Sequence, residues 1–322
     1  MSAGDAATAP PSTSDSTAAA ADESRDGAGL LRWAKDPFVI GALVLWIGTL
    51  FALRSLHFEN TLPVVTMRAS DQIALPGATV ELTAEVSRLL PDGLLEREGI
   101  EVDLRLATEA PGTGLVKTDA QGIAHRSVIA PSEPGVVRFA VDVGGEYSTA
   151  IGIRFDPTLT VLDPARPVVL CEIDALSPPE SEWAEQFGDL GQVTLDLIPD
   201  AIRSVQALSE KRQLVFLHLG PTEISDAWRG AFRLRQLPAI PILSPQRPAE
   251  SSDDVRARVL AEWNGTWGEV GAVITRSATG CFVYRGANLP TVVLAGPPCD
   301  GARSASNWSE VQSTIEEWVP TD

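Results

Sequence analysis

The sequence is poor in the residues that build metal sites and disulfide frameworks. It has three cysteines and three histidines in 322 residues. Cys171, Cys281 and Cys299 are far apart, form no Cys-x-x-Cys pair and have no histidine at zinc-like spacing, which excludes a zinc module and a disulfide-stapled fold. Cys171 lies in an apolar stretch and is interpreted as an inert core residue. The sequence leaves open whether Cys281 and Cys299 pair, because pairing needs Cα atoms within about 7 Å.

Basic residues are also scarce, since 25 Lys and Arg face 43 Asp and Glu, for a net charge of −18. This balance disfavours nucleic acid and anionic membrane surfaces as partners, and no nucleic-acid partner is expected. Walker, Gly-x-Gly-x-x-Gly, Gly-x-Ser-x-Gly and His-Glu-x-x-His motifs are absent, which removes the enzyme classes that depend on them. A protein partner stays possible, because a subset of the tryptophans could form an exposed surface.

The amino-terminal part combines a polar tail with an apolar run. Residues 1–30 contain mostly Ala, Ser, Thr, Asp, Gly and Pro, a composition that predicts disorder. The run DPFVIGALVLWIGTLFALR then has 17 uncharged residues between Asp36 and Arg54, which predicts a transmembrane helix over 36–56. A buried core helix is the alternative. A slight excess of basic residues before the run favours an extracytoplasmic location for the bulk of the chain.

Residues 63–158 alternate between polar and apolar in short runs that turn signals separate. ATVELTAEV, IEVDLRLA and GVVRFAVDV have the two-residue period of half-buried strands, while LPDG, APGTG and SEPG supply turns. About seven such strands predict an all-β sandwich. The stretches PGATVELTAEV and VKTDAQGIAHRSVIAPSEPGVVRFAV resemble bacterial immunoglobulin-like (Ig-like) domains of the invasin and intimin type, which implies a structural stalk.

Residues 165–320 switch to alternating strands and helices. PVVLCEI, QLVFLHLG, AIPILS, VGAVITR and TVVLAG predict strands, and DAIRSVQALSEK, DDVRARVLAEWNG and SNWSEVQSTIEEW predict helices, the last capped by Asn307 or Ser309. This order predicts a Rossmann-like parallel sheet with helices on both faces. The expected fold class is therefore multi-domain: a transmembrane helix, an all-β Ig-like sandwich and an α/β parallel-sheet domain.

Two acidic residues, Glu172 and Asp174, stand at the end of the first predicted strand of this domain. Ligands bind at the carboxyl ends of strands in open parallel sheets. Residues two apart in an extended chain point to the same side, where two carboxylates could hold Mg²⁺ or one could attack phosphorus. Three interpretations are open: a polar pair that caps the strand, a relic of a ligand site, or a working phosphatase.

The motifs around this pair resemble the haloacid dehalogenase (HAD) superfamily, in particular its lipin and phosphatidate phosphatase-like branch. VVLCEIDAL stands where the family has Asp-x-Asp, LVFLHLGP where it has a strand ending in Ser or Thr, and LPAIPILS and AVITRSATGCFVYRGANLPTVVLAG follow in the family's order. The resemblance covers about residues 166–297 and implies Mg²⁺-dependent hydrolysis of a phosphomonoester. An accidental likeness on another Rossmann-like sheet is the alternative.

Carried over residue by residue, the resemblance places the nucleophile at Glu172 and the general acid at Asp174, and both would hold the metal in an active enzyme. The phosphate-binding hydroxyl falls on His218, and the late metal-binding turn falls on Thr275 to Thr279, which has no carboxylate. Glutamate adds one methylene to the expected aspartate, and a misplacement of about 1 Å can lower a rate on the order of 100-fold.

The expected lysine has no counterpart, and Arg256 or Arg258 would supply its charge, although a guanidinium imitates an ammonium ion poorly. With so many departures, we expect a single-pass membrane protein with an Ig-like stalk and a catalytically inactive HAD-like domain. That domain would bind or scaffold a partner and need no cofactor. A divergent Mg²⁺-dependent phosphatase is the alternative.

Overall fold

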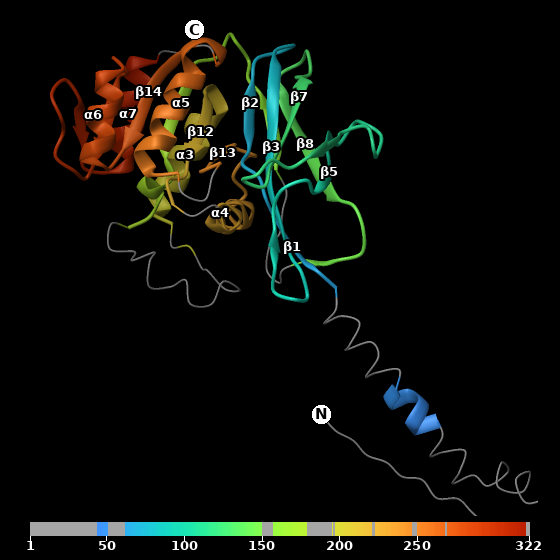
Figure 1. The fold of residues 1–322 in the computed structure, drawn as a ribbon. Coiled ribbons are helices and arrows are strands. Elements are labelled where there is room, and N and C mark those ends of the chain that lie inside the picture. Colours follow the sequence, from blue (N-terminus) through green and yellow to red (C-terminus); the bar gives the residue numbers. More distant parts are fainter. Residues whose placement is uncertain are drawn as a thin grey trace, which may run out of the picture. The chain divides into compact units, whose positions relative to one another are not determined.

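A computed structural model of the chain describes residues 43–50, 62–149, 157–178, 195, 197–220, 223–246, 250–267 and 269–319. The chain divides into two compact units, Met1–Asn60 and Thr61–Asp322. All of the labelled strands and helices belong to the second unit (Figure 1).

The first unit contains a helix at residues 43–50 with exposed side chains. No helix within the described ranges is long and apolar enough to cross a membrane. This finding contradicts the transmembrane helix predicted over 36–56, and with it the membrane partner and the single-pass membrane localisation. The remainder of that span and the tail at 1–30 lie outside the described residues.

Two five-stranded sheets occupy the first part of the second unit. The first has the order β4 (Leu95–Glu96), β3 (Thr79–Leu89), β1 (Val64–Arg68), β9 (Ser148–Thr149), with β7 (Ile123–Ile129) also paired to β3. The second has the order β2 (Gln72–Ala74), β10 (Thr158–Val161), β8 (Gly135–Val143), β5 (Glu101–Leu106), β6 (Leu115–Lys117). Alternate residues of both sheets point into one shared core, which includes Leu82, Val102 and Leu159.

These sheets contradict the all-β Ig-like sandwich expected over 63–158. Both are mixed, because β1 pairs with β9 and β2 pairs with β10 in parallel. They also belong to the same compact unit as a parallel α/β sheet. The physical reason for the error is that alternation indicates which residues are extended, whereas the choice of pairing partner depends on contacts distant in sequence.

The rest of the unit is built on a six-stranded parallel sheet. Its order is β13 (Ile242–Leu243), β12 (Gln213–Leu217), β11 (Val168–Glu172), β14 (Val270–Thr275), β15 (Thr291–Leu294), β16 (Arg303–Ala305). The elements between the strands are η1 (Ile173–Leu176), α3 (Pro199–Lys211), α4 (Glu223–Leu234), α5 (Ser252–Thr266) and α6 (Ala278–Gly286), and α7 (Trp308–Trp318) follows the last strand.

The strand order places the first strand, β11, in the middle of the sheet. The chain moves outward through β12 and β13, returns to β14 on the other side of β11, and continues to β15 and β16. This is the doubly wound order, and its topological switch point lies between β11 and β14. Ligands of such sheets bind in the crevice beyond the carboxyl ends of these two strands. The order identifies the doubly wound class, while the HAD resemblance rests on motifs and stays a proposal.

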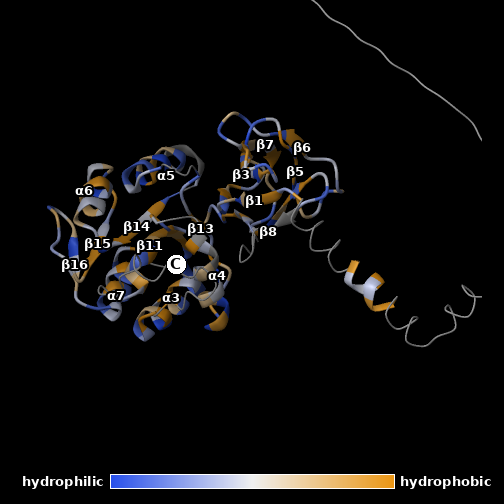
Figure 2. Cartoon of the chain, turned by 60° about the horizontal axis from the view of Figure 1, so that its bottom comes forward, coloured by the Kyte–Doolittle hydropathy of each residue, from blue (hydrophilic) through white to orange (hydrophobic). Residues whose placement is uncertain are grey.

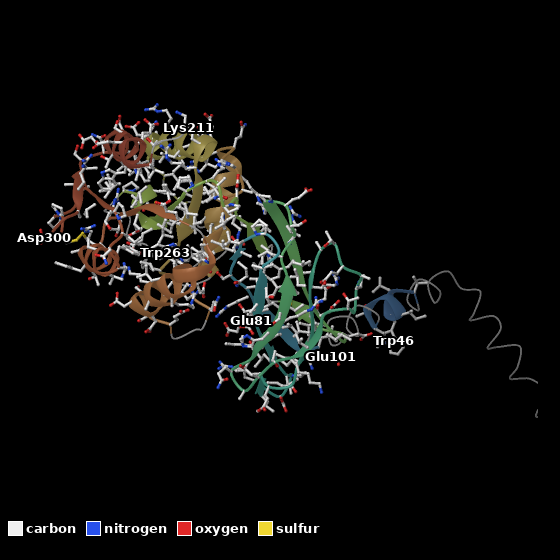
Figure 3. The ribbon with its side chains drawn as sticks, turned by 90° about the horizontal axis from the view of Figure 1, so that it is seen from above. Trp46, Glu81, Glu101, Lys211, Trp263 and Asp300 are labelled. Atoms are coloured by element: carbon white, nitrogen blue, oxygen red, sulfur yellow. A yellow bond between two sulfur atoms is a disulfide. The ribbon has the colours of Figure 1, made fainter. Side chains whose placement is uncertain are left out.

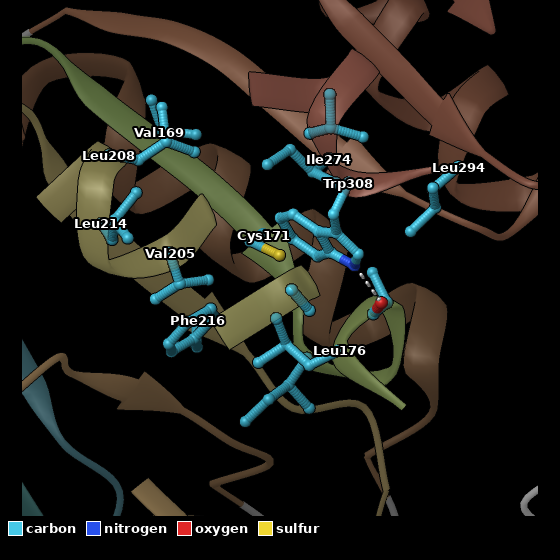
Figure 4. Packing of buried hydrophobic residues seen from close by; sticks show 14 of the residues in the cluster. Val169, Cys171, Leu176, Val205, Leu208, Leu214, Phe216, Ile274, Leu294 and Trp308 are labelled. Atoms are coloured by element: carbon cyan, nitrogen blue, oxygen red, sulfur yellow. Dashed lines mark hydrogen bonds between the residues drawn. The ribbon is translucent and has the colours of Figure 1, made fainter. Parts of the chain in front are cut away.

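Each face of the parallel sheet is covered by its own helices (Figure 2). Helices α3, α4 and α7 cover one face, where Trp308 packs beside Cys171 and its indole N–H donates to the carbonyl of Ala175 (Figure 4). Helices α5 and α6 cover the other face, where Val259 and Tyr284 are fully buried. Burial on both faces explains why the strands read as continuous apolar runs.

Polar side chains close the β13 edge of the sheet. Both carboxylate oxygens of Asp71 accept hydrogen bonds: Oδ2 from the amide of Ile242 at 2.8 Å, and Oδ1 from the amide and hydroxyl of Thr158. Arg229 Nη2 lies 3.0 Å from Oδ1, and Asp71 is only 2 % exposed. An edge strand otherwise offers unpaired amides, so this carboxylate both satisfies the edge and joins it to the mixed sheets.

Replacing Asp71 by Ala should strongly destabilise the unit, because it removes the buried carboxylate that pairs with Arg229 and accepts from the Ile242 amide. Removal of one member of a buried ion pair costs about 3–5 kcal/mol. Urea unfolding measures the loss, and the matched control is Asp300→Ala at an exposed aspartate. A wild-type midpoint in the Asp71 variant would contradict this assignment.

Candidate functional site

The candidate site is built around Glu172, the last residue of β11. Every residue of this strand is buried, and Glu172 is 0 % exposed. Alternation along the strand directs its side chain to the face covered by α5 and α6, opposite Cys171. The carboxylate therefore lies beside the switch point of the sheet, where a doubly wound fold ordinarily leaves room for a ligand.

Three protein donors satisfy the Glu172 carboxylate. Oε1 accepts from Arg256 Nε at 2.7 Å and from the Tyr284 hydroxyl at 2.9 Å. Oε2 accepts from the Thr275 hydroxyl. Hydrogen bonds from a guanidinium to a carboxylate are among the strongest in proteins. The arrangement, called the Glu172 cluster below, thus compensates the negative charge from within the fold.

Each donor of the Glu172 cluster comes from a different element. Arg256 lies in α5, which begins with a capping box formed by Ser251 and Asp254. Tyr284 lies in α6, and Thr275 ends β14, the neighbour of β11 across the switch point. The cluster therefore ties two central strands to both helices of one face.

A glycine allows α6 to approach the carboxylate. A Cβ atom at Gly280 would lie 2.7 Å from the Thr275 hydroxyl oxygen and 2.8 Å from Oε1 of Glu172. Such contacts are too short, so only glycine fits here. Gly280 belongs to the first turn of α6, which brings the positive end of the helix dipole to the carboxylate.

The protonation of the donors follows from this environment. Burial first, and then the charge of Glu172, hold the pKa of Tyr284 well above its usual value, so the phenol keeps its proton and donates. Burial lowers the pKa of Arg256, but the hydrogen bond and charge of Glu172 outweigh it and raise that pKa overall. Arg256 also pairs with Asp253 at 2.9 Å.

Asp174 does not share the orientation of Glu172, contrary to the expectation from an extended chain. The strand ends at Glu172, and Asp174 lies in the 3-10 turn η1, where it is exposed. Crowding by protein atoms, and then the charge of Glu172, raise the pKa of Asp174 from 3.8 to about 6, against the opposing charges of Arg276 and Arg256. Its solvent contact moderates this shift.

The structure brings together three of the predicted site residues, Glu172, Arg256 and Thr275, in direct hydrogen bonds. His218, predicted to contact phosphate, is buried one residue beyond β12, where its amide donates to the carbonyl of Leu243 at 2.7 Å. It is not among the donors to Glu172. Asp174 interacts electrostatically with Glu172 and Arg256 and is not among the hydrogen-bond partners of Glu172.

The sequence analysis missed Gly280 and Tyr284. They are four residues apart in α6, so both lie on one face of the helix. The available signal was the spacing of Gly280 and Tyr284: a phenol four residues after a glycine, in a helix that covers a parallel sheet, indicates a close approach of the helix to a buried polar group. Neither residue could be matched to Glu172 without the packing of α6 on β11, which links positions 112 residues apart.

The structure also answers the question about the cysteines. Cys281 and Cys299 form a disulfide with a Cα–Cα distance of 5.9 Å. Cys171 is free and buried on the opposite face of the sheet, where burial raises the pKa of its thiol well above the usual value. The disulfide ties α6 to the segment between β15 and β16, one residue from Gly280.

The residues around Glu172 do not fit the Mg²⁺ ion that the family resemblance implies. Mg²⁺ requires oxygen ligands that approach in octahedral geometry. Both oxygens of Glu172 already accept hydrogen bonds, one of them from a cation, and Asp174 lies beyond the strand, exposed in η1. Within the described part of the chain, no group of three or more His, Cys, Asp or Glu residues is placed to hold a metal.

Breaking the Glu172 cluster should destabilise the fold. Glu172→Gln removes the buried counter-charge of Arg256 and leaves only the exposed carboxylate of Asp253 as its partner, so about 3–5 kcal/mol of unfolding free energy should be lost. Arg256→Met should cost a similar amount, and Glu172→Gln combined with Arg256→Met should cost less than the sum of the two. Urea unfolding measures all three. The control, Glu317→Gln, breaks an exposed ion pair with Arg303 and should change little, whereas additive losses would refute direct coupling.

Asp174 should make stability fall as pH rises between about 4 and 6. Its pKa is about 6 in the folded protein against an ordinary value of 3.8, so the folded state binds more protons in this window. Asp174→Asn should lack this fall, so the unfolding free energy of the wild type minus that of the variant should decrease as pH rises through the window. A constant difference across the window would show that the carboxyl titrates normally.

Comparison with known proteins provides no family for the chain. No protein-family model matches it, and no curated protein matches it significantly. Among solved structures, it shows a slight likeness to ferredoxin-NADP+ reductase from Plasmodium falciparum, with 7% sequence identity over 81% of this chain and 92% of that one, and a TM-score of 0.18. A likeness at this level carries no argument about fold or function, so the function must be argued from the residues themselves.

Proposed function

We propose that the α/β part of the second unit is a degenerate relative of the HAD superfamily that binds or scaffolds a partner molecule and does not hydrolyse phosphoesters. The observation that carries this proposal is the state of Glu172. The resemblance aligns Glu172 with the family's nucleophile, and in the structure its carboxylate is fully buried and held by Arg256, Tyr284 and Thr275.

A nucleophilic carboxylate must bring an unshared oxygen lone pair to the phosphorus atom within about 3–3.5 Å. Glu172 faces the backbone of α6 instead, with no room for even a methyl group at Gly280. Opening the site would require α6 to move and the pair with Arg256 to break. Because breaking a buried ion pair is costly, this geometry supports a structural role for Glu172.

Arg256 supplies the positive charge that a phosphatase of this type would take from a metal ion. Its side chain is only about 5 % exposed, and the Nε–Oε1 distance is 2.7 Å. A cation built into the fold needs no free metal, but it cannot coordinate an incoming phosphoryl oxygen at the same time as it holds Glu172. This arrangement supports the proposal that the domain is a scaffold with the fold of the family but without its catalytic activity.

One observation favours the alternative of a divergent phosphatase. Asp174 is exposed at the carboxyl end of the sheet, and its pKa of about 6 suits a group that gives and takes protons near neutral pH. Proton transfer alone does not replace a missing nucleophile, however. We therefore keep this function as the second candidate.

Phosphate release by the purified full-length chain separates the two functions. With p-nitrophenyl phosphate and Mg²⁺, we expect no release above that of the Asp174→Asn variant. We also expect no change in melting temperature when Mg²⁺ is added, because Glu172 has no free oxygen to offer. The reference for instrument response is a commercial phosphatase under the same conditions. Steady, Mg²⁺-dependent release that disappears in Asp174→Asn would overturn the proposal.

A further inference from the structure

A second concave site lies at the opposite, amino-terminal edge of the parallel sheet. A cavity of about 720 Å³ is formed where β11, β14 and β15 begin and where α3 and α7 end. Its volume falls within the range of about 300–1,000 Å³ that is usual for ligand pockets. The wall residues used in the argument are Arg166, Lys211, Trp263, Glu269, Asn288 and Trp318.

The frame of this cavity is fixed by contacts within the protein. Arg166 Nη2 donates to the carbonyl oxygens of Ser209 and Arg212 at the end of α3. A Cβ atom at Gly271 would lie 2.7 Å from a methyl group of Val319, so the floor is closely packed. A ligand would therefore enter a preformed cavity and lose little affinity to ordering of the protein.

Two tryptophans from different helices contribute to the wall. Trp263 comes from α5 on one face of the sheet, and Trp318 ends α7 on the other. Arg303 holds the Trp318 ring through a cation–π contact of 5.0 Å and is itself fixed by two hydrogen bonds to Glu317. Indoles offer broad apolar surface with a polar N–H at the edge, which suits ligands that are part apolar and part hydrogen-bonding.

Three polar groups of the wall are uncommitted. The side chains of Lys211, Glu269 and Asn288 make no hydrogen bond or ion pair with any other described residue. Lys211 and Trp263 are marked in Figure 3. Together these groups offer an ammonium donor, a carboxylate acceptor and an amide that does both. The cavity can therefore exchange several hydrogen bonds with a ligand without breaking existing ones.

The charges select against ionic ligands. Arg166 is engaged with the carbonyls of Ser209 and Arg212, and the two uncommitted charges of the wall, Lys211 and Glu269, are of opposite sign, so the cavity presents no strong excess of free charge to an ionic ligand. A neutral ligand with many hydroxyl groups and apolar C–H faces meets all of these conditions. We propose that the cavity binds a neutral oligosaccharide of about two to three sugar rings, the size that fits a pocket of this class.

The inference rests on the proposed function in one respect, because it names a ligand for a domain assigned a binding role. Isothermal titration of the full-length chain uses three probes: cellotriose, maltotriose and N,N′,N″-triacetylchitotriose. At least one should saturate the protein below about 10 mM, which is within the weak range of small-ligand affinities. If none of the three saturates at that concentration, the proposal is wrong.

Variants of surface groups then place the binding in the cavity. Glu269→Gln combined with Asn288→Ala should weaken it about tenfold, because each lost hydrogen bond is worth about 0.5–1.5 kcal/mol. Trp318→Phe should weaken it less, since the phenyl ring keeps part of the apolar surface. The matched control is Phe282→Ala, which removes an aromatic ring that is 65% exposed on α6 and outside the cavity.

Equal affinity of the wild type and the Glu269→Gln, Asn288→Ala variant would overturn the assignment to this cavity. Circular dichroism melts of every variant exclude unfolding as the cause of a loss. The phosphate-release assay is run on the same preparation. Absence of sugar binding with no phosphate release would sink only the ligand assignment, whereas phosphate release would sink the proposed function and leave sugar binding to be judged by itself.

Discussion

The ion pair between Glu172 and Arg256 lies at the carboxyl end of β11, beside the topological switch point of the doubly wound sheet, where a buried negative charge must be balanced by the protein itself. There β14 ends, and the helix that follows it, α6, packs back over the sheet. A lone carboxylate buried at this point would be very costly, whereas Glu172 accepts hydrogen bonds from a guanidinium, a phenol and a hydroxyl. The position of α6, and with it the closure of the switch-point crevice, depends on this set of contacts.

Asp71 plays a comparable part at the edge of the same sheet. Both carboxylates are buried, both are paired with arginine, and each joins elements that are distant in sequence. The difference lies in what they connect: Glu172 joins strands to their covering helices, and Asp71 joins the edge strand β13 to the mixed sheets. Buried ionic groups of this kind add little net stability compared with apolar packing, but they penalise alternative arrangements that would leave them unpaired.

Local features of the fold were predictable from the sequence, and long-range ones were not. The apolar run before Glu172 predicts a strand that the structure contains as β11, and Asn307, one of two expected caps, begins α7. The run over 36–56 predicted a membrane span, but no helix among the described residues is long and apolar enough to cross a membrane, so hydropathy alone was an insufficient guide. Alternation likewise could not reveal that β1 and β2 take parallel partners. For the site, motif order drew attention to Glu172 and Arg256, but their contact joins residues 84 apart in sequence.

The disulfide between Cys281 and Cys299 gives the Glu172 cluster a dependence on thiol chemistry. Cys281 follows Gly280 directly and precedes Tyr284 by three residues, so the covalent link fastens the helix that presents both to the carboxylate. A crosslink across 18 residues removes about 3 kcal/mol of freedom from the unfolded chain. In a reducing milieu, α6 would depend on noncovalent contacts alone. The packing of α6 on the Glu172 carboxylate therefore depends on the redox state of the protein, although neither Cys281 nor Cys299 donates a hydrogen bond to that carboxylate.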